Sequence, residues 1–577
     1  MANNEVTINR SSLFFKRFIT NFVVSALGQF LFIFASFLDS MIAGNLLDVD
    51  ALNAIQVITP INTLMYFVCN LCSSGVTARY FYILNKGEKE RAHRLAFTSI
   101  VATIIIGILT ATLFFFIRDP FINLFPLNEA TREYARNYYF WFIIMAIFFP
   151  TYLLIAEFVA KDCDNAIKVS SDISQCVIKI VLSFILVRYL STFGLGLATF
   201  ISFACALLIV CAHFFRKKNS IKLCFSFNFN DLGVGIKLSI GYAFAFLCCS
   251  IITFVQNVFV SKFFGAQYLP VVTIINFMLT LCGVVRRISN SISPLVTMAY
   301  SSKNKNDYDY LIKLVNKFTN IFTPIFSLVV IALFPCILML YNIKPDSGIY
   351  WYCVVALISL ASIYIASVHL RNICNIYVCM QKTSIFIIYD LLTIFFNVPI
   401  SLLFALPFGL NGMSISFALT YVVDLLIIGL LLFIQNKPHK LYKDFDVDED
   451  QYSVDIVLNK ENIKTSISLF KEFLDKYDIN EELKNDILCE LEEVYESVMK
   501  FNPNKKVIDR VTVCIGKSEI RLLNKNNGRL IPDEEKQKEI KNTKNHPHFT
   551  TLYEERSDFS IFGSSTFNCG YLSVPLR

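Results

Sequence analysis

The sequence predicts a mainly α-helical membrane protein with twelve transmembrane helices in two six-helix parallel repeats, followed by a small cytosolic α/β domain. Three observations predict this class. The 577 residues are 55% hydrophobic and only 17% charged, an apolarity that a soluble surface cannot accommodate. Long uncharged runs recur up to about residue 440. After Lys443 the composition changes abruptly to that of a polar domain.

The spanning segments come first along the chain. A helix needs about 20 mostly apolar residues to cross the hydrocarbon core. Twelve segments meet this requirement: 17–43, 53–78, 96–117, 134–158, 169–190, 193–214, 237–262, 268–299, 317–341, 350–372, 384–405 and 411–435. Lys and Arg cluster in alternate loops, and such loops stay in the cytoplasm. We therefore expect a multi-pass protein of the plasma (inner) membrane with both termini cytoplasmic.

The membrane part contains an internal repeat. The stretch FLDSMIAGNLLDVDAL at 37–52 has the same layout as FVQNVFVSKFFGAQYL at 254–269, an offset of 217. The tripeptide FGL at 193–195 recurs at 408–410, an offset of 215. Because six spans is an even number, both halves enter the membrane in the same sense. An axis along the membrane normal should relate them, with a site between them at mid-depth.

These patterns predict four parts of the chain. The first six-helix lobe is 1–220 and the second is 221–440; an acidic linker at 441–451 leads to a cytosolic α/β domain at 452–577. Within that domain, residue periodicity predicts two amphipathic helices and three strands. The helices are 461–476 and 480–501, and the strands are 452–459, 506–516 and 517–524.

The composition also argues against several functions. Most of the 17 Cys lie in apolar runs, and the one CxxC, at 69–72, has no second pair at metal-binding spacing. The net charge of +7 is too small and dispersed for nucleic acid. We expect no enzyme activity, metal or cofactor. The expected partners are membrane lipid, a small-molecule substrate, a coupling ion and a cytosolic protein that contacts the C-terminal domain.

Asp39 is the first candidate for function. It ends a long uncharged run, yet the apolar residues SMIAG follow it, so its carboxylate is expected inside the membrane. A charge at that depth costs about 3 kcal/mol on insertion scales, so it indicates function by default. In a low dielectric a carboxylate can be protonated or bound to a cation near neutral pH. An ion-coupling group requires this property.

Other charges lie within predicted spans. Lys179 is about ten residues inside the fifth span, where it could pair with Asp39 or extend to the cytoplasmic surface. Arg286 and Arg287 lie in the cytoplasmic half of the eighth span, where their side chains could extend toward the inner interface. If these cations face a cavity, they suit an anionic substrate, since the guanidinium matches phosphate and carboxylate geometry. Asp390 is a further cavity candidate that could neutralise them.

Residues 12–438 resemble the multidrug and toxic compound extrusion (MATE) transporters. The first helix of that family carries an Asp followed by small residues and a turn, as Asp39 does here. The stretch SSGVTARYFYILNKGEKERAHR at 73–94 looks like the exit of the second helix, and SNSISPLVTMAYSSKNKNDY at 289–308 is similar to its counterpart. The resemblance implies a secondary transporter that exports a drug or toxic compound by alternating access, in exchange for protons or sodium.

The chain also departs from that family. In many members an Asn and an Asp on the fifth helix complete a cation site with the first-helix Asp. Aligning 177–186 with that helix places Lys179 and Ser183 at those positions. The seventh helix offers Gln256 and Asn257 rather than an acid. The resemblance therefore implies coupling through Asp39 without its usual partners, and these four residues join the cavity candidates.

The C-terminal domain resembles the Bergerat-fold (GHKL) ATPases, in particular the anti-sigma-factor kinases. Residues 479–501 look like their first-box helix, where Glu493 matches but Ser497 replaces the magnesium-ligating Asn. Asn526 stands where the adenine-reading Asp belongs, and Gly528 is kept. These changes imply a degenerate nucleotide site or an interaction module, with weak or absent ATP binding.

Alternatives to drug export remain open. The chain could be a flippase or exporter of an anionic or lipid-linked precursor, which cationic cavity residues would favour. It could instead be a membrane-anchored nucleotide-binding regulator. A third possibility combines transport with regulation, the C-terminal domain gating the transporter.

Overall fold

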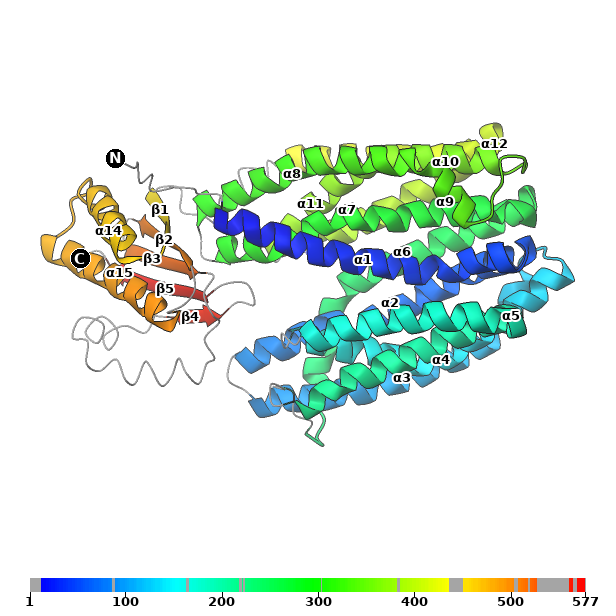
Figure 1. Cartoon of the computed structure of the whole chain (residues 1–577), viewed down its shortest axis with the longest axis horizontal. Helices are drawn as coiled ribbons and strands as arrows, with labels where there is room; N and C mark the ends of the chain where they lie inside the picture. Colours follow the sequence, from blue (N-terminus) through cyan, green and yellow to red (C-terminus); the bar gives the residue numbers. More distant parts are fainter. Residues whose placement is uncertain are drawn as a thin grey trace. The chain divides into compact units, whose positions relative to one another are not determined.

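Figure 1 shows the computed structural model of the 577-residue chain. The residues that it describes are 12–85, 89–161, 165–216, 221, 224–301, 304–380, 384–434, 450–502, 507–516, 519–526, 560–563 and 568–575. The chain divides into two compact units. A membrane unit comprises Val24–Ser289 and Asn316–Leu430. The other unit comprises Met1–Val23, Asn290–Val315 and Leu431–Arg577.

Long apolar helices dominate the chain (Figure 1). The long helices are α1 (Ser12–Leu46), α2 (Val49–Asn85), α3 (Lys89–Asn123), α4 (Glu129–Lys161), α5 (Asn165–Cys211), α6 (Phe229–Phe263), α7 (Leu269–Ser301), α8 (Lys305–Ala332) and α12 (Ser384–Ile434). Shorter helices are η1 (Ala212–Phe215), η2 (Ala266–Tyr268), α9 (Phe334–Leu340), α10 (Tyr350–Ser362) and α11 (Tyr364–Cys379).

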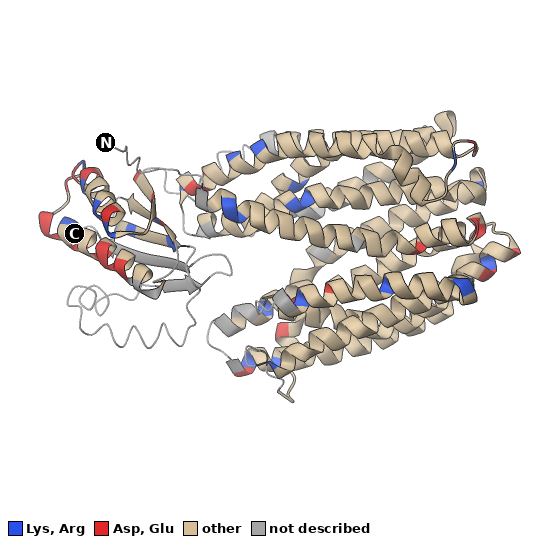
Figure 2. Ribbon diagram, viewed as in Figure 1, with Lys and Arg blue, Asp and Glu red and all other residues tan. Residues whose placement is uncertain are grey.

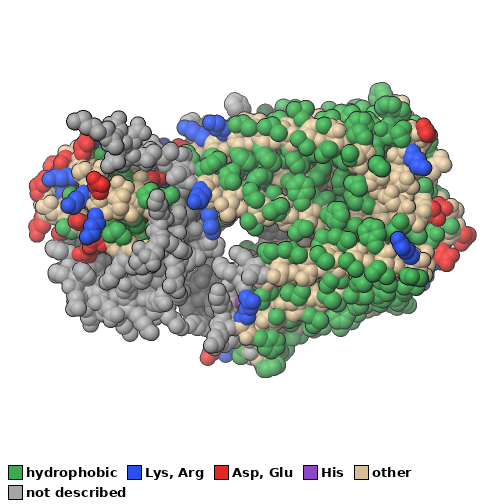
Figure 3. All heavy atoms as spheres, in the orientation of Figure 1, with side chains coloured by type: hydrophobic (Ala, Val, Ile, Leu, Met, Phe, Trp, Pro, Cys, Tyr) green, Lys and Arg blue, Asp and Glu red, His purple; other side chains and the backbone are tan. Residues whose placement is uncertain are grey.

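These helices have the composition of membrane spans. Within the described residues, nine are long and apolar enough to cross a bilayer, or ten if the bent pair α10–α11 is one span. Figure 2 shows few charged residues along them, and Figure 3 shows hydrophobic side chains over most of the face that these helices present in this view. Exposed Leu109 and Phe116 on α3 are examples. A protein with such a surface is stable only in lipid, so the chain is a multi-pass membrane protein.

Two of the spans, α5 and α12, are helical hairpins. In α5 the Ser171 hydroxyl donates to the Ala206 carbonyl at 3.1 Å, although a straight helix would separate these residues by about 50 Å. In α12 the Thr393 hydroxyl donates to Asp424 Oδ2 at 3.0 Å, again between residues far apart along the helix. Each hairpin therefore crosses the membrane twice, which raises ten described spans to the predicted twelve.

The hairpin turns reveal the internal repeat. The backbone reverses at Ser191 (φ 51°, ψ −134°) and at Gly409 (φ 61°, ψ −149°), 218 positions apart. The helices α1 and α6 both contain 35 residues and begin 217 positions apart, as the sequence predicts. The FGL recurrence, at an offset of 215, is three residues out of register with the turns. The repeat is therefore real, but that tripeptide does not mark equivalent positions.

The first helix of each half contacts the opposite half. Helix α6 lies so close to α2 that a Cβ atom on Gly75 would be 2.3 Å from the Gly235 carbonyl oxygen, so only glycine fits there. Helix α1 is joined to the turn after α9, where Asn45 donates to the Leu340 carbonyl at 2.6 Å and Asn342 donates to the Gly44 carbonyl at 2.9 Å. The two halves thus meet along α1 and α6.

The C-terminal domain is a two-layer α/β fold. Its antiparallel sheet has the order β1-β2-β3-β5-β4, and α14 and α15 pack on one face over a core that includes Val454, Val513 and Leu522. The elements are β1 (Asp450–Val457), α14 (Lys460–Leu474), α15 (Glu481–Phe501), β2 (Ile508–Ile515), β3 (Glu519–Asn526), β4 (Ser560–Gly563) and β5 (Asn568–Pro575). Both helices and the first three strands were predicted within a few residues. The last two strands were not.

The two hairpin turns make a matched prediction about stability. Replacing Ser191 by Gly should stabilise the protein by about 1 kcal/mol, because it relieves a positive φ that side chains rarely adopt. Replacing Gly409 by Ser should destabilise it by about 1–2 kcal/mol for the same reason. Thermal unfolding of the purified protein in detergent measures both.

Gly241→Ser provides the control, since a Cβ atom there meets nothing within 4 Å and the helix is regular. It should change stability by no more than a few tenths of a kcal/mol. A Gly409→Ser variant as stable as the Gly241→Ser variant would contradict the explanation.

Candidate functional site

The Asp39 carboxylate lies inside the protein. Asp39 is on α1, which continues for seven residues to Leu46, so the carboxylate is roughly 10 Å from the helix end. The residue is 1% exposed. The alternative weighed for this carboxylate, a helix end in bulk water, is therefore excluded.

Three side chains from two other helices converge on this carboxylate. The Tyr138 hydroxyl, from α4, donates to Asp39 Oδ2 at 2.6 Å. The Thr199 hydroxyl, from the second arm of α5, donates to the same oxygen at 3.2 Å. The Lys179 ammonium, from the first arm of α5, lies 3.2 Å from that oxygen. All of these side chains are buried, and we call the four residues the Asp39 cluster.

Lys179 neutralises Asp39 from within the protein. Its ammonium also donates to the Ala35 carbonyl at 2.6 Å, one turn before Asp39 on α1, so it is held against that helix by two contacts. A second cation beside this carboxylate would be repelled strongly by the ammonium, since screening is weak in a buried site. The sequence left open a pair with Asp39 or an extension toward the surface, and the structure shows the pair.

The Asp39 cluster also has unused hydrogen-bonding capacity. Among the described residues, Asp39 Oδ1 accepts no hydrogen bond, and the buried Ser183 hydroxyl has no partner. Ser183 follows Lys179 by one helical turn on α5, so both face the same side of that arm. Buried polar atoms without partners are costly, and they are concentrated at functional sites.

Gln256 and Asn257, predicted as cavity residues, have different environments. Asn257 exchanges two hydrogen bonds with Gln56 on α2: its amide donates to the Gln56 backbone carbonyl at 2.8 Å, and the Gln56 amide donates back at 2.9 Å. This pair joins α2 to α6. Gln256 is buried, and its side-chain amide has no partner among the described residues. Neither residue is hydrogen-bonded to the Asp39 cluster in the described part of the chain.

Arg286 is a half-buried cation with neutral partners. On α7, its Nε donates to the Ser367 hydroxyl at 2.8 Å and its Nη2 to the Tyr421 hydroxyl at 3.0 Å. Its guanidinium also lies 5.6 Å from the centre of the Tyr421 ring. In the part of the chain that the structure describes, no carboxylate is within ion-pair distance of Arg286.

Arg287 follows Arg286 and extends in another direction. Its Nε donates to Gln29 Oε1 on α1 at 3.1 Å, which joins the two halves. Arg371 on α11 lies near enough to Arg287 to repel it electrostatically. We call Arg286, Arg287 and Arg371 the arginine group. Asp390, the predicted counter-charge, is on α12, but its side chain lies outside the described residues.

The predicted nucleotide site of the C-terminal domain is only partly described. Glu493 is half-buried on α15. The side chains of Ser497 and Asn526 lie outside the described residues, as does all of Gly528. Burial, with a smaller effect of the Glu493 charge, raises the pKa of Glu490 to about 7. Residues 560–563 and 568–575, near the end of the chain, form the paired strands β4 and β5.

Sequence reasoning missed Tyr138, Thr199 and Gln29. Tyr138 lies in the aromatic run NYYFWF, where nothing distinguishes it from neighbours that pack in the core. Thr199 is separated from Lys179 by the hairpin turn, and only that turn brings both to the same carboxylate. The placement of Lys179 beside Asp39 was among the predictions.

The fold and the Asp39 cluster define a class, that of two-lobed membrane proteins built from paired six-helix repeats. The MatE family model matches residues 25–185, which contain most of the Asp39 cluster. Over these residues the chain is similar to the MATE transporters. No curated protein matches the chain significantly.

Solved structures show the same fold. An inward-facing multidrug resistance MATE transporter of the MOP superfamily has a TM-score of 0.65 at 15% identity, covering 74% of this chain and 99% of its own. An outward-facing structure of such a transporter has a TM-score of 0.62 at 15% identity, covering 76% and 100%. A MOP superfamily transporter from Pyrococcus furiosus, described as having a binding pocket of reversed polarity, has a TM-score of 0.62 at 15% identity, covering 76% and 99%.

The buried pair makes a prediction about stability. Asp39→Asn and Lys179→Met should each destabilise the protein. The loss should be about 3 kcal/mol or more where a charge is left buried without its partner, as the Asp39 carboxylate is after Lys179→Met. The double variant should be more stable than Lys179→Met alone, because no unpaired charge is left. Thermal unfolding in detergent for the four proteins gives this cycle. Strictly additive effects would show that the two charges do not interact.

Proposed function

We propose that the chain is a secondary transporter that exports a small molecule by alternating access and is driven by protons through Asp39. The observation that carries this proposal is the Asp39 cluster. The Asp39 carboxylate is neutralised by the ammonium of Lys179, a side chain of the same protein. A sodium ion could bind this carboxylate only by displacing Lys179, so the charge of Asp39 changes only when it gains or loses a proton. Protons are therefore favoured over sodium.

The proposed coupling follows from the contacts of the cluster. Protonation of Asp39 removes the charge that holds the Lys179 ammonium, while the hydroxyls of Tyr138 and Thr199 can rotate to serve a neutral carboxyl. Because α1 also contacts the second half through Asn45, a change at this carboxylate alters a helix shared by both halves. A proton thus has different affinities in two arrangements of the helices, which coupling requires.

Proteoliposome efflux tests the coupling ion. The wild-type protein should move dye under an imposed proton gradient and should not respond to a sodium gradient. Asp39→Asn should reduce the gradient-driven flux by about tenfold or more, within the range of coupling energies between sites. Thr110→Val is the control and should retain flux, because Thr110 is buried outside the cluster and its hydroxyl bonds only to the Ile106 carbonyl of its own helix. Sodium-driven flux in the wild type would contradict proton coupling.

A second candidate concerns the charge of the substrate. The arginine group favours a flippase or exporter of an anionic or lipid-linked precursor over an exporter of cationic drugs. Arg286 has neutral partners only among the described residues, so its charge remains available to a phosphate or carboxylate. The reversed pocket polarity described for the Pyrococcus furiosus transporter is consistent with variation in substrate charge on this fold.

Dyes of opposite charge test this candidate. Arg286→Gln should weaken transport or binding of anionic substrates by about tenfold, because a charge-assisted hydrogen bond is lost, and should leave cationic dyes unaffected. Arg286→Lys, which keeps the charge but not the fork, should give an intermediate loss. Transport of cationic dyes only, unchanged by Arg286→Gln, would favour drug export instead.

A further inference from the structure

The C-terminal domain buries both faces of its sheet. On one face, Val454 on β1, Val513 on β2 and Leu522 on β3 pack against α14 and α15. Side chains alternate along a strand, so the intervening residues point to the other face. These are also buried, and most are polar. They include Ser453, Asp455, Arg510, Thr512, Arg521 and Lys525. We call them the polar sheet face.

The described side chains of the polar sheet face include more than one cation. Arg510 and Lys525 are both buried, and Asp455 accepts a hydrogen bond from Arg510. Buried charge is stable only when it is paired. Arg510 and Lys525 therefore suit an acidic partner.

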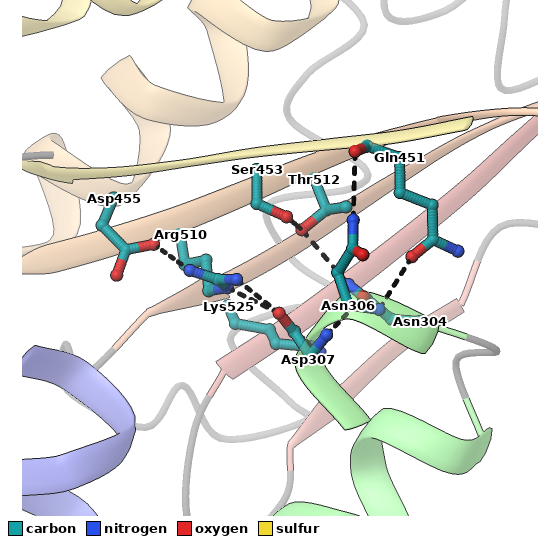
Figure 4. A network of polar contacts seen from close by, with 9 residues as sticks. All are labelled: Asn304, Asn306, Asp307, Gln451, Ser453, Asp455, Arg510, Thr512 and Lys525. Atoms are coloured by element: carbon teal, nitrogen blue, oxygen red, sulfur yellow. Dashed lines mark hydrogen bonds and ion pairs between the residues drawn. The ribbon is translucent and has the colours of Figure 1, made fainter. Parts of the chain in front are cut away.

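Residues before and within the first turns of α8 supply that partner (Figure 4). Asp307, which is fully buried, accepts hydrogen bonds from Arg510, with Nε at 3.1 Å, and from the Lys525 ammonium at 3.0 Å. Asn304 caps α8 by accepting from the Asp307 backbone N–H at 3.0 Å, and its amide donates to Thr512 at 3.3 Å. An acid near a helix N-terminus is also favoured by the helix dipole.

Two further contacts extend the docked surface. The Asn306 amide donates to the Gln451 carbonyl at 3.1 Å on β1. The buried ring of Phe14, near the start of α1, lies 5.2 Å below the Arg510 guanidinium and 6.3 Å from the Tyr310 ring. The polar sheet face is thus covered by the starts of two membrane helices of the same chain.

We infer that the polar sheet face is a docking surface for the start of α8 and that docking restrains transport, so the C-terminal domain is a built-in brake. This rests on the proposed transport function. Residues Asn304–Tyr310 are continuous with α8, which runs to Ala332 in the membrane unit. Docking of these residues on the sheet stabilises the arrangement of membrane helices that permits docking. It therefore slows the conversion to the other arrangement that transport requires.

Docking can be measured without transport, on the full-length protein in nanodiscs. Cys514 is buried on β2 and has the same parity as Arg510 and Thr512, whereas Cys489 on α15 is exposed. In the wild type, maleimide should label Cys514 far more slowly than Cys489, as followed by peptide mass spectrometry. Asp307→Asn, which lies outside the C-terminal domain, should accelerate labelling of Cys514 severalfold and leave Cys489 unchanged. Lys313→Gln, exposed on the same helix, is the control.

The same proteins are then compared for transport. Asp307→Asn should raise the initial rate about fivefold, at the low end of couplings between sites, and Lys525→Met should act in the same direction from the sheet side. Equal labelling of Cys514 and Cys489 in the wild type would overturn docking. Faster Cys514 labelling with an unchanged or lower transport rate would overturn the brake while leaving docking in place. Absence of wild-type transport would overturn the proposed function, and the labelling result would still decide docking.

Discussion

A charge inside a low-dielectric interior must be matched by another charge, and this constraint organises both units of the protein. In the membrane unit, Asp39 and Lys179 neutralise each other, and the helices that carry them are held together as a result. In the other unit, Asp307 does the same for Arg510 and Lys525. Such pairs contribute little net stability compared with apolar packing, but removal of one member is costly. They therefore determine which helices and strands must lie together.

The two pairings differ in what surrounds them. The carboxylate of Asp39 retains one oxygen without a hydrogen bond from the described residues, and Ser183 nearby has an unused hydroxyl. Both carboxylate oxygens of Asp307 accept hydrogen bonds, and its backbone N–H donates to the capping residue Asn304. A group with spare capacity can change its protonation or ligand at small structural cost, whereas a saturated one is fixed until its partner leaves. The environment of Asp39 therefore suits ion coupling, and that of Asp307 suits attachment of the start of α8 to the sheet.

Much of the fold could be predicted from the sequence, because hydrophobic length and loop charge are local properties. The twelve spans, the repeat and most of the C-terminal elements follow from them. Contacts between distant residues could not be predicted in the same way. Thr199 reaches Asp39 only because the chain reverses at Ser191, a residue with no preference for that conformation. The strands β4 and β5 were missed because their place in the sheet is set by long-range pairing, of β5 with β3 and of β4 with β5.

The hairpins of α5 and α12 have a consequence for biogenesis. The two antiparallel arms of each hairpin are connected by a backbone reversal at a single residue, Ser191 in α5 and Gly409 in α12. No long polar loop separates the arms, so one arm cannot enter the bilayer while the other stays in water. The arms must therefore partition from the insertion machinery together, as one preformed unit. Their mutual hydrogen bonds, such as that between Ser171 and Ala206, would already shield backbone and hydroxyl groups at that stage.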